Sequence, residues 1–427
     1  MIKYEPVIGL EVHAQVKTAS KMFCGCSADS FGLEPNSNTC PVCLALPGAL
    51  PVPNEVAVKK TVQLAQALGC RLAEFSQFER KNYFYPDLPK GFQISQYAHP
   101  VGEMGEFEGI TVRRVHLEED TGKLIHEGGE SLVDFNRSGV PLIEIVTEPE
   151  FSDPTVVTKF LKELRKHLVF MDISTADMEK GSLRLEANIS LRRIGEKGLP
   201  PYKVELKNIN SFAFLEKALG VEIKRQQELL EKGEEVAQET RGYNEKQGVT
   251  VSQRRKEEAF DYRYFPEPDL PPLTKSVLMA GEKSATPQEK RESYLALGVP
   301  SQYLEVLIED RELSALFESL RSEIPTAELG NILVNERFGD PLELGKEKIL
   351  SLYRAKHKIE VLSGKDLASS TEKILLDNQT AVADYVQGKE NALQFLLGQL
   401  MKETGGKVAP KEALDLLKKA IHARTSA

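Results

Sequence analysis

The stretch Ile8-Gly9-Leu10-Glu11-Val12-His13-Ala14-Gln15-Val16 alternates apolar and polar residues near the start of the chain. Such alternation is typical of a β-strand with one buried face, because successive side chains of a strand point to opposite sides. Glu11 and His13 therefore share one face, and Leu10 and Val12 share the other. The pattern predicts a sheet with one apolar and one polar face.

Further strand patterns follow along the chain, and few helices separate them. The predicted strands are Ile110–Leu117, Ser131–Phe135, Leu142–Val146, Ser182–Arg192 and Tyr202–Lys207. Helices are predicted after Asn54 and Asp153, which are typical N-cap residues, and over Phe212–Lys232. Grouped strands with short connections predict an α+β fold with a mainly antiparallel sheet.

The polar faces of two of these strands carry residues that suit a cation and phosphate groups. Arg184 and Glu186 share a face of one strand, and Glu205 and Lys207 share a face of the other. Carboxylates suit Mg²⁺, and arginine and lysine suit phosphate oxygens. Antiparallel sheets commonly expose one face to water, so a merely solvated surface stays open as the alternative.

Two other segments are dense in reactive side chains. Glu118, Glu119 and Asp120 are adjacent carboxylates at the end of a predicted strand, and they repel one another unless water or cations relieve them. The alternative is an exposed acidic turn. Lys81 and Tyr83 lie on a loop that interleaves basic and aromatic residues, a combination that can hold a phosphate and stack on a base. Aromatic packing within the loop is the alternative there.

The cysteines form two closely spaced pairs, Cys24-Gly25-Cys26 and Cys40-Pro41-Val42-Cys43, in a chain with five cysteines. Four thiolates on two tight turns can close a tetrahedral zinc site. Such a site leaves no open position for catalysis, so it predicts a structural Zn²⁺. Two disulfides or clustered core cysteines are the alternatives.

The composition limits the class of protein, and a proline-rich segment indicates a domain boundary. The chain has 427 residues, 41% of them hydrophobic, and a formal net charge of −9. No apolar run is long enough to span a membrane, and the N-terminus lacks a signal core, so a cytoplasmic protein is expected. The proline-rich segment 265–273 is interpreted as the exit from the main domain. We expect domains at 1–285, 286–330 and 331–427, the last two helical.

Several catalytic signatures are missing from the sequence. It contains no G-x-x-x-x-G-K-[ST] phosphate loop and no G-x-S-x-G nucleophile turn. The spacing of the cysteines assigns them to a metal, which argues against a cysteine nucleophile.

Long motifs of the chain resemble the B subunits of glutamyl/aspartyl-tRNA amidotransferases (the GatB family). They include Ile8–His13, Cys40–Leu44, Arg80–Gly91, Val133–Glu144 and Glu205–Phe212, and the likeness runs from residue 5 to about residue 273. Gly388–Leu393 and Gly398–Lys402 resemble the family's C-terminal tRNA-binding domain, of YqeY type. The resemblance implies a catalytic cradle domain with a zinc knuckle, a helical linker domain and a shortened helical tail.

The resemblance also implies a function. Together with an amidase A subunit and a small C subunit, such a protein amidates misacylated tRNA(Gln) or tRNA(Asn). The B subunit phosphorylates the tRNA-bound carboxylate with ATP, and ammonia from the A subunit then displaces the phosphate. A carboxylate is a poor acyl donor, and an acyl phosphate has a good leaving group. Phosphoryl transfer of this kind needs Mg²⁺ and cationic side chains.

Carried over residue by residue, the resemblance assigns roles on the polar faces of the strands. The catalytic Mg²⁺ site is expected at Glu11, His13, Glu119 and Glu205, with Glu118 as the near alternative to Glu119. Phosphate contacts are expected from Arg184, Lys207 and Asn208, and substrate contacts from Lys81 and Tyr83. Glu186 is also expected at the ATP site, although Leu185-Glu186 stands where the family has Cys-Asp.

Two other functions stay open. A zinc-stabilised tRNA-binding scaffold without the kinase step would not need the group Glu11, His13, Glu119 and Glu205. A free ATP-dependent ligase for a small amino acid lacks any local signature. The sequence does not decide between glutamyl-tRNA and aspartyl-tRNA as the substrate.

Overall fold

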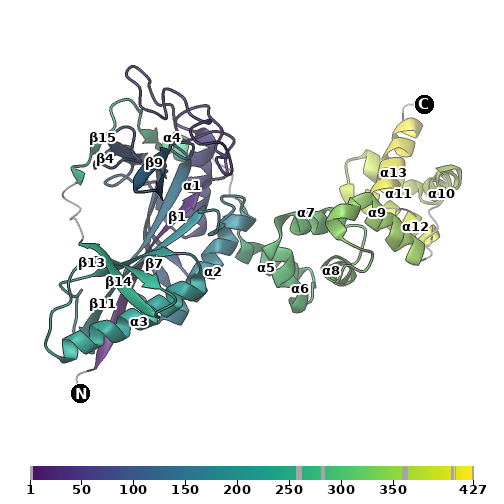
Figure 1. The fold of residues 1–427 in the computed structure, drawn as a ribbon. Helices are drawn as coiled ribbons and strands as arrows, with labels where there is room; N and C mark the ends of the chain where they lie inside the picture. Colours follow the sequence, from purple (N-terminus) through teal and green to yellow (C-terminus); the bar gives the residue numbers. More distant parts are fainter. Residues whose placement is uncertain are drawn as a thin grey trace. The chain divides into compact units, whose positions relative to one another are not determined.

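The chain divides into two compact units, Met1–Glu292 and Ser293–Ala427, in a computed structural model (Figure 1). The structure describes residues 3–255, 262–279, 284–357, 364–404, 408 and 410–425. The first unit is built on a large sheet, and the second is helical.

A nine-stranded sheet forms the first unit, in the order β14-β13-β12-β11-β1-β10-β7-β6-β2. Neighbours among these described strands are antiparallel, except that β12 and β13 run parallel. The prediction of an α+β fold with a mainly antiparallel sheet is confirmed. The strands are β1 (Tyr4–Gln15), β2 (Arg71–Leu72), β6 (Gly102–Phe107), β7 (Ile110–Glu119), β10 (Pro141–Thr147), β11 (Leu183–Arg193), β12 (Val204–Ile209), β13 (Glu239–Asn244) and β14 (Val249–Arg255).

Three helices, α1 (Glu55–Ala67), α2 (Pro154–Phe170) and α3 (Phe212–Glu231), pack along the sheet (Figure 1). The predicted caps are confirmed, since Asn54 accepts a hydrogen bond from the backbone N–H of Ala57 and Asp153 from that of Thr155. Leu10, Val12 and the alternate residues of β11 are buried on the apolar face of the sheet. The polar face is left for a functional site.

Short strands and hairpins complete the first unit. The segment 265–273, interpreted as a domain exit, pairs at both of its ends with this unit through β15 and β16. Arg80 donates to both carboxylate oxygens of the buried Glu267, at 2.7 and 2.9 Å, and so anchors the segment. These elements are β3 (Phe75–Ser76), β4 (Glu79–Asn82), β5 (Phe92–Ser95), β8 (Lys123–Glu127), β9 (Glu130–Asp134), β15 (Phe265–Pro266), β16 (Leu273–Thr274) and α4 (Lys275–Leu278).

The second unit consists of short helices. Its last part has a hydrophobic core of its own, built from α10, α12 and α13. The expected boundary between residues 330 and 331 falls inside α8. None of the described helices combines the length and apolar character that a membrane span requires. The helices from the domain junction onward are α5 (Pro287–Ala296), α6 (Ser301–Glu309), α7 (Arg311–Leu320), α8 (Thr326–Val334), α9 (Pro341–Lys356), α10 (Gly364–Asp377), α11 (Gln379–Val386), α12 (Glu390–Glu403) and α13 (Pro410–Thr425).

Candidate active site and metal centre

The register of the sheet aligns the polar residues of neighbouring strands. His13 on β1 lies opposite Glu144 on β10 and Arg184 on β11. Glu11 lies opposite Glu186 on β11. Residues directly opposite each other in an antiparallel pair point to the same face, so the pairing collects these side chains on the polar face.

A cavity of about 1750 Å³ covers this polar face. Its lining contains all the residues that the sequence assigned to magnesium, phosphate and substrate, except Glu119. Those residues are Glu11, His13, Lys81, Tyr83, Glu118, Arg184, Glu186, Glu205, Lys207 and Asn208.

The first cluster in the cavity, the His13 group, consists of His13, Glu118 and Glu144, with ligand atoms within 4.8 Å of one another. His13 Nε2 lies 3.5 Å from Glu118 Oε1 and 3.5 Å from Glu144 Oε2. Burial alone lowers the pKa of His13, but the hydrogen bond and charge of Glu144, together with Glu118, raise it to about 9. Without a cation, the imidazolium itself compensates the carboxylates.

The second cluster, the Glu11 group, consists of Glu11, Glu186 and Glu205, whose ligand oxygens also lie within 4.8 Å of one another. Burial raises the pKa of Glu11, and the nearby carboxylates of Glu144, Glu186 and Glu205 raise it further. Lys207 Nζ lies 2.8 Å from Glu186 Oε2 and 3.7 Å from Glu205 Oε2. Three buried or half-buried carboxylate oxygens are the ligands that Mg²⁺ prefers, so the donor set fits such an ion.

The structure therefore divides the expected magnesium ligands between two clusters. Glu11 and Glu205 belong to one, and His13 to the other. The two groups lie side by side on the same face of the sheet, because Glu11 and His13 are two residues apart on β1.

The structure corrects the expected position of Glu119. The sequence placed it with His13, but its carboxylate accepts hydrogen bonds from Lys90 Nζ at 2.6 Å and from the Ile94 backbone N–H at 2.9 Å. Glu118 points to the cavity and Glu119 to the other face of β7, because adjacent strand residues alternate. The near alternative, Glu118, is the residue that the structure brings to His13.

The two adjacent acids allow a matched test. We expect Glu118→Gln to weaken Mn²⁺ binding by about tenfold or more, because it removes one charged oxygen ligand from the His13 group. Glu119→Gln is expected to leave Mn²⁺ affinity unchanged. Titration of the full chain with Mn²⁺, followed by electron paramagnetic resonance, measures both. Equal loss in the two variants would contradict the assignment.

The sequence assigned no role in the site to Glu144, His116 and Asp120. Glu144 faces His13 from the middle of β10, and His116 Nε2 lies 3.2 Å from its Oε2. Although burial opposes this, the two imidazoles hold the pKa of Glu144 well below its usual range. Asp120 accepts hydrogen bonds from Arg184 at 3.0 Å and from Gln15 at 2.8 Å. The sequence pattern that could have revealed Glu144 is a single carboxylate within an otherwise apolar strand.

Aromatic residues also line the cavity, among them Tyr83, Tyr97, Tyr262 and Tyr264. Lys81 Nζ lies 5.1 Å from the ring centre of Tyr262 and 5.9 Å from that of Tyr83. Burial opposes its charge, but Tyr264 and the carboxylates of Glu118 and Glu144 more than offset this, so the pKa of Lys81 is raised. Lys81 thus stays cationic inside an aromatic setting. At another point of the lining, Asn208 Nδ2 donates to Gln253 Oε1 at 3.2 Å.

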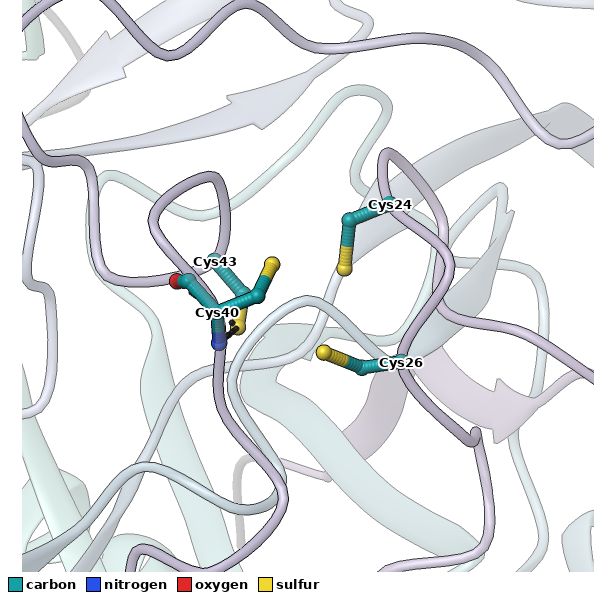
Figure 2. Close-up of side chains that lie close together, drawn as sticks. All are labelled: Cys24, Cys26, Cys40 and Cys43. Carbon is teal, nitrogen blue, oxygen red and sulfur yellow. Dashed lines mark hydrogen bonds between the residues drawn. The ribbon is translucent and has the colours of Figure 1, made fainter.

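The four paired cysteines converge from two loops, outside the cavity of the sheet (Figure 2). Their sulfurs lie within 4.8 Å of one another, and all five cysteines of the chain are free thiols. The backbone N–H of Cys40 donates to Cys43 Sγ at 3.1 Å, and Lys21 Nζ lies 3.6 Å from the same sulfur. A hydrogen bond from Cys24 lowers the pKa of Cys43 to about 4, although burial opposes this. Cys24, Cys26, Cys40 and Cys43 can therefore hold a metal ion, as predicted, because thiolates are the ligating form.

Known proteins are similar to this chain in sequence over nearly its full length. The B subunit of the aspartyl/glutamyl-tRNA(Asn/Gln) amidotransferase of Caldanaerobacter subterraneus subsp. tengcongensis is 42% identical over 475 aligned positions, covering 98% of this chain and 100% of the relative. The protein of the same name from Thermotoga maritima is 41% identical over 480 positions, covering 98% and 99%. That of Thermomicrobium roseum is 43% identical over 481 positions, with the same coverage.

Two family models match consecutive parts of the chain. The GatB/GatE catalytic domain matches residues 6–279, which include the whole cavity lining. The GatB domain, of YqeY type, matches residues 305–421. With a sheet whose polar face gathers two acidic clusters, a four-cysteine cluster and a helical second unit, the chain belongs to the GatB family.

Proposed function

We propose that this chain is the B subunit of a glutamine-dependent amidotransferase that acts on Glu-tRNA(Gln) or Asp-tRNA(Asn). In this reaction the tRNA-bound side-chain carboxylate attacks the γ-phosphorus of ATP, and ADP leaves. Ammonia then attacks the acyl phosphate carbon, inorganic phosphate leaves, and the amide forms. The three relatives carry the name of such a protein.

One observation carries the proposal: the two acidic clusters and the cations Lys81, Arg184 and Lys207 line one cavity. Phosphoryl transfer is catalysed mainly by positioning and by compensation of charge, so it needs such a cavity rather than a nucleophile. A purely tRNA-binding scaffold has no use for buried carboxylates that repel one another.

Each group in the cavity has a proposed task. The Glu11 group and the His13 group would hold Mg²⁺, which would supply charge neutralisation on the phosphate oxygens. Lys207 and Arg184 are held by Glu186 and Asp120, at 2.8 and 3.0 Å, and so present their charge in fixed directions. Lys81 and Tyr83 contact the aminoacyl end of the tRNA.

Reconstitution tests this proposal against the two other functions. The chain is combined with an amidase subunit, a small C subunit, misacylated tRNA and γ-labelled ATP. We expect ADP formation that requires Mg²⁺ and Glu-tRNA(Gln) or Asp-tRNA(Asn), and that correctly charged Gln-tRNA(Gln) does not support. Binding of tRNA without ADP formation would indicate the scaffold instead. ADP formation with free glutamate alone would indicate the small ligase.

The metal of the four-cysteine cluster is proposed to be Zn²⁺. Two closely spaced cysteine pairs without a fifth ligand are typical of structural zinc, and the cluster lies outside the cavity where the chemistry is proposed. A cytoplasmic location, in which thiols stay reduced, agrees with this assignment.

The tail is proposed to bind tRNA. Lys418, Lys419, His422 and Arg424 are exposed on α13, and residues from α10 onward have their own core. Ending the chain at residue 357 removes this core without cutting a helix. We expect tRNA affinity to fall by about tenfold or more, with a shallower dependence on salt, because fewer phosphate contacts release fewer counterions.

Electrophoretic titration with tRNA at several salt concentrations measures this effect. Zinc content and tRNA-independent Mn²⁺ binding serve as controls, and both are expected to be unchanged. A truncated chain with full affinity would show that the tRNA contacts lie elsewhere.

A further inference from the structure

Strand β13 is the point where the sheet departs from its antiparallel order. It pairs in parallel with β12, to which α3 connects it, and Glu205 on β12 lies opposite Thr240 on β13. Parallel strands need such a crossover helix. The position of β13 beside Glu205 therefore depends on how α3 and β13 are joined.

A buried ionic network joins these two elements. Glu222 on α3 is 0% exposed, and its carboxylate lies 3.5 Å from Arg241 Nε on β13. Thr250 on β14 donates to Glu222 Oε2 at 2.7 Å and accepts from Arg241 Nε at 3.0 Å. Gln226 adds a donor to Glu222 Oε1 at 2.9 Å. Buried charges satisfied from several sides hold a unique arrangement, because breaking any contact leaves an uncompensated group.

Thr240, the residue before Arg241, points to the opposite side of β13 from Arg241. Its hydroxyl donates to Glu205 Oε2 at 2.8 Å, and it is 2% exposed, while Glu205 is 4% exposed. The same Oε2 lies 3.7 Å from Lys207 Nζ. Both contacts to one oxygen fix the rotation of the carboxylate toward Glu11 and Glu186.

We propose that Thr240 is the positioning residue of the Glu11 group: its hydroxyl orients the Glu205 carboxylate for a divalent cation, and the Glu222–Arg241 network holds Thr240 in place. The proposal rests on the proposed role of the Glu11 group in cation binding. A neutral donor orients the ligand without removing its charge, as partners of metal-binding carboxylates do.

The test uses the full-length chain and Mn²⁺ alone, without ATP or tRNA. We expect Thr240→Val to weaken Mn²⁺ binding by about tenfold, since loss of such a partner typically costs 10–100-fold in affinity. Glu205→Gln, which removes a charged oxygen from the cluster, is expected to weaken Mn²⁺ binding more strongly but still measurably. Thr240→Ser, which keeps the hydroxyl, is expected to bind as the wild type does. Electron paramagnetic resonance titration measures the affinities.

Thr250→Val is the matched control. It removes a hydroxyl from another buried threonine, one that also donates to a carboxylate, at 2.7 Å, but that carboxylate is Glu222. We expect it to lower the melting temperature but to leave Mn²⁺ affinity unchanged, because Arg225 and Gln226 still hold the Glu222 carboxylate and Thr240 keeps its hydrogen bond to Glu205. A purely structural role of Thr240 predicts the same behaviour for both valine variants, which would overturn the proposal.

A double-variant cycle gives a second, independent outcome. In the Glu205→Gln background, Thr240→Val is expected to cause no further change in Mn²⁺ binding, because the two residues act as one unit. Additive effects would contradict the proposal. Since no ATP or tRNA is present, weaker Mn²⁺ binding in Thr240→Val supports the role of Thr240 even if reconstituted transamidation fails.

Discussion

Replacing Glu205 with glutamine, or His13 with alanine, is expected to abolish acyl phosphate formation. Each change removes a ligand from one of the two acidic clusters of the cavity. Losing several kcal/mol of charge stabilisation at the transferring phosphoryl group corresponds to a decrease of about a thousandfold in rate. ADP release from labelled ATP, in the reconstituted complex with misacylated tRNA, measures this decrease.

The two variants have controls that separate chemistry from folding. Glutaminase activity of the proposed amidase subunit without tRNA is expected to survive, because the proposed function places that activity on another chain. Binding of tRNA is also expected to survive, since the exposed basic residues of α13 are untouched. Glu235→Gln, an isosteric change at an exposed position, should leave ADP release unaltered. Normal transamidation by the His13 or Glu205 variant would show that the polar face is only a solvated surface.

Replacing Cys43 with serine is expected to remove the metal of the cysteine cluster. Wild-type chain should contain about one zinc per chain, and the variant close to none, because a serine hydroxyl is not a thiolate ligand at neutral pH. Binding free energy of structural zinc is also folding free energy, so residues 20–45 should unfold locally. Elemental analysis measures the metal, and limited proteolysis the unfolding.

Cys70→Ser is the matched control for this change. Cys70 is buried like Cys43, but it does not belong to the four-cysteine cluster. We expect it to retain zinc and to resist cleavage between residues 20 and 45. Retention of zinc in the Cys43 variant, or equal loss in both, would contradict the assignment.

Local patterns were enough to predict the strands β1, β7, β9, β10, β11 and β12 and the helices α1, α2 and α3, but not the other strands of the first unit, such as β6, β13 and β14. Alternation places Glu11 with His13, and Arg184 with Glu186, on one face of each strand, and the structure agrees. Cap residues Asn54 and Asp153 begin the helices that they predicted. These features depend on neighbours in the sequence, so the chain by itself determines them. The spacing of the four cysteines is local within each pair, and it also predicted their cluster correctly.

The tertiary structure decided how the carboxylates are divided between the His13 group and the Glu11 group. Which acids meet depends on strand order and register, and these are set by pairing between segments far apart in the chain. Glu205 on β12 and Glu11 on β1 come together because both strands pair with β11, on its two sides. Glu144 escaped notice because β10 is buried along its whole length, so its apolar neighbours show no alternation.

Glu118 and Glu119 show most directly what the sequence alone cannot predict. Both residues are acidic and adjacent, so the sequence shows that they point in opposite directions but not which of them points to His13. The pairing of Leu142 with Glu118 on the neighbouring strand, and the ion pair of Glu119 with Lys90, decide it. The sequence determined the main strands, their two faces and the clustering of the four cysteines. Only the tertiary structure decided which carboxylates lie together in one cluster, because a register shift of one residue exchanges the two faces of a strand.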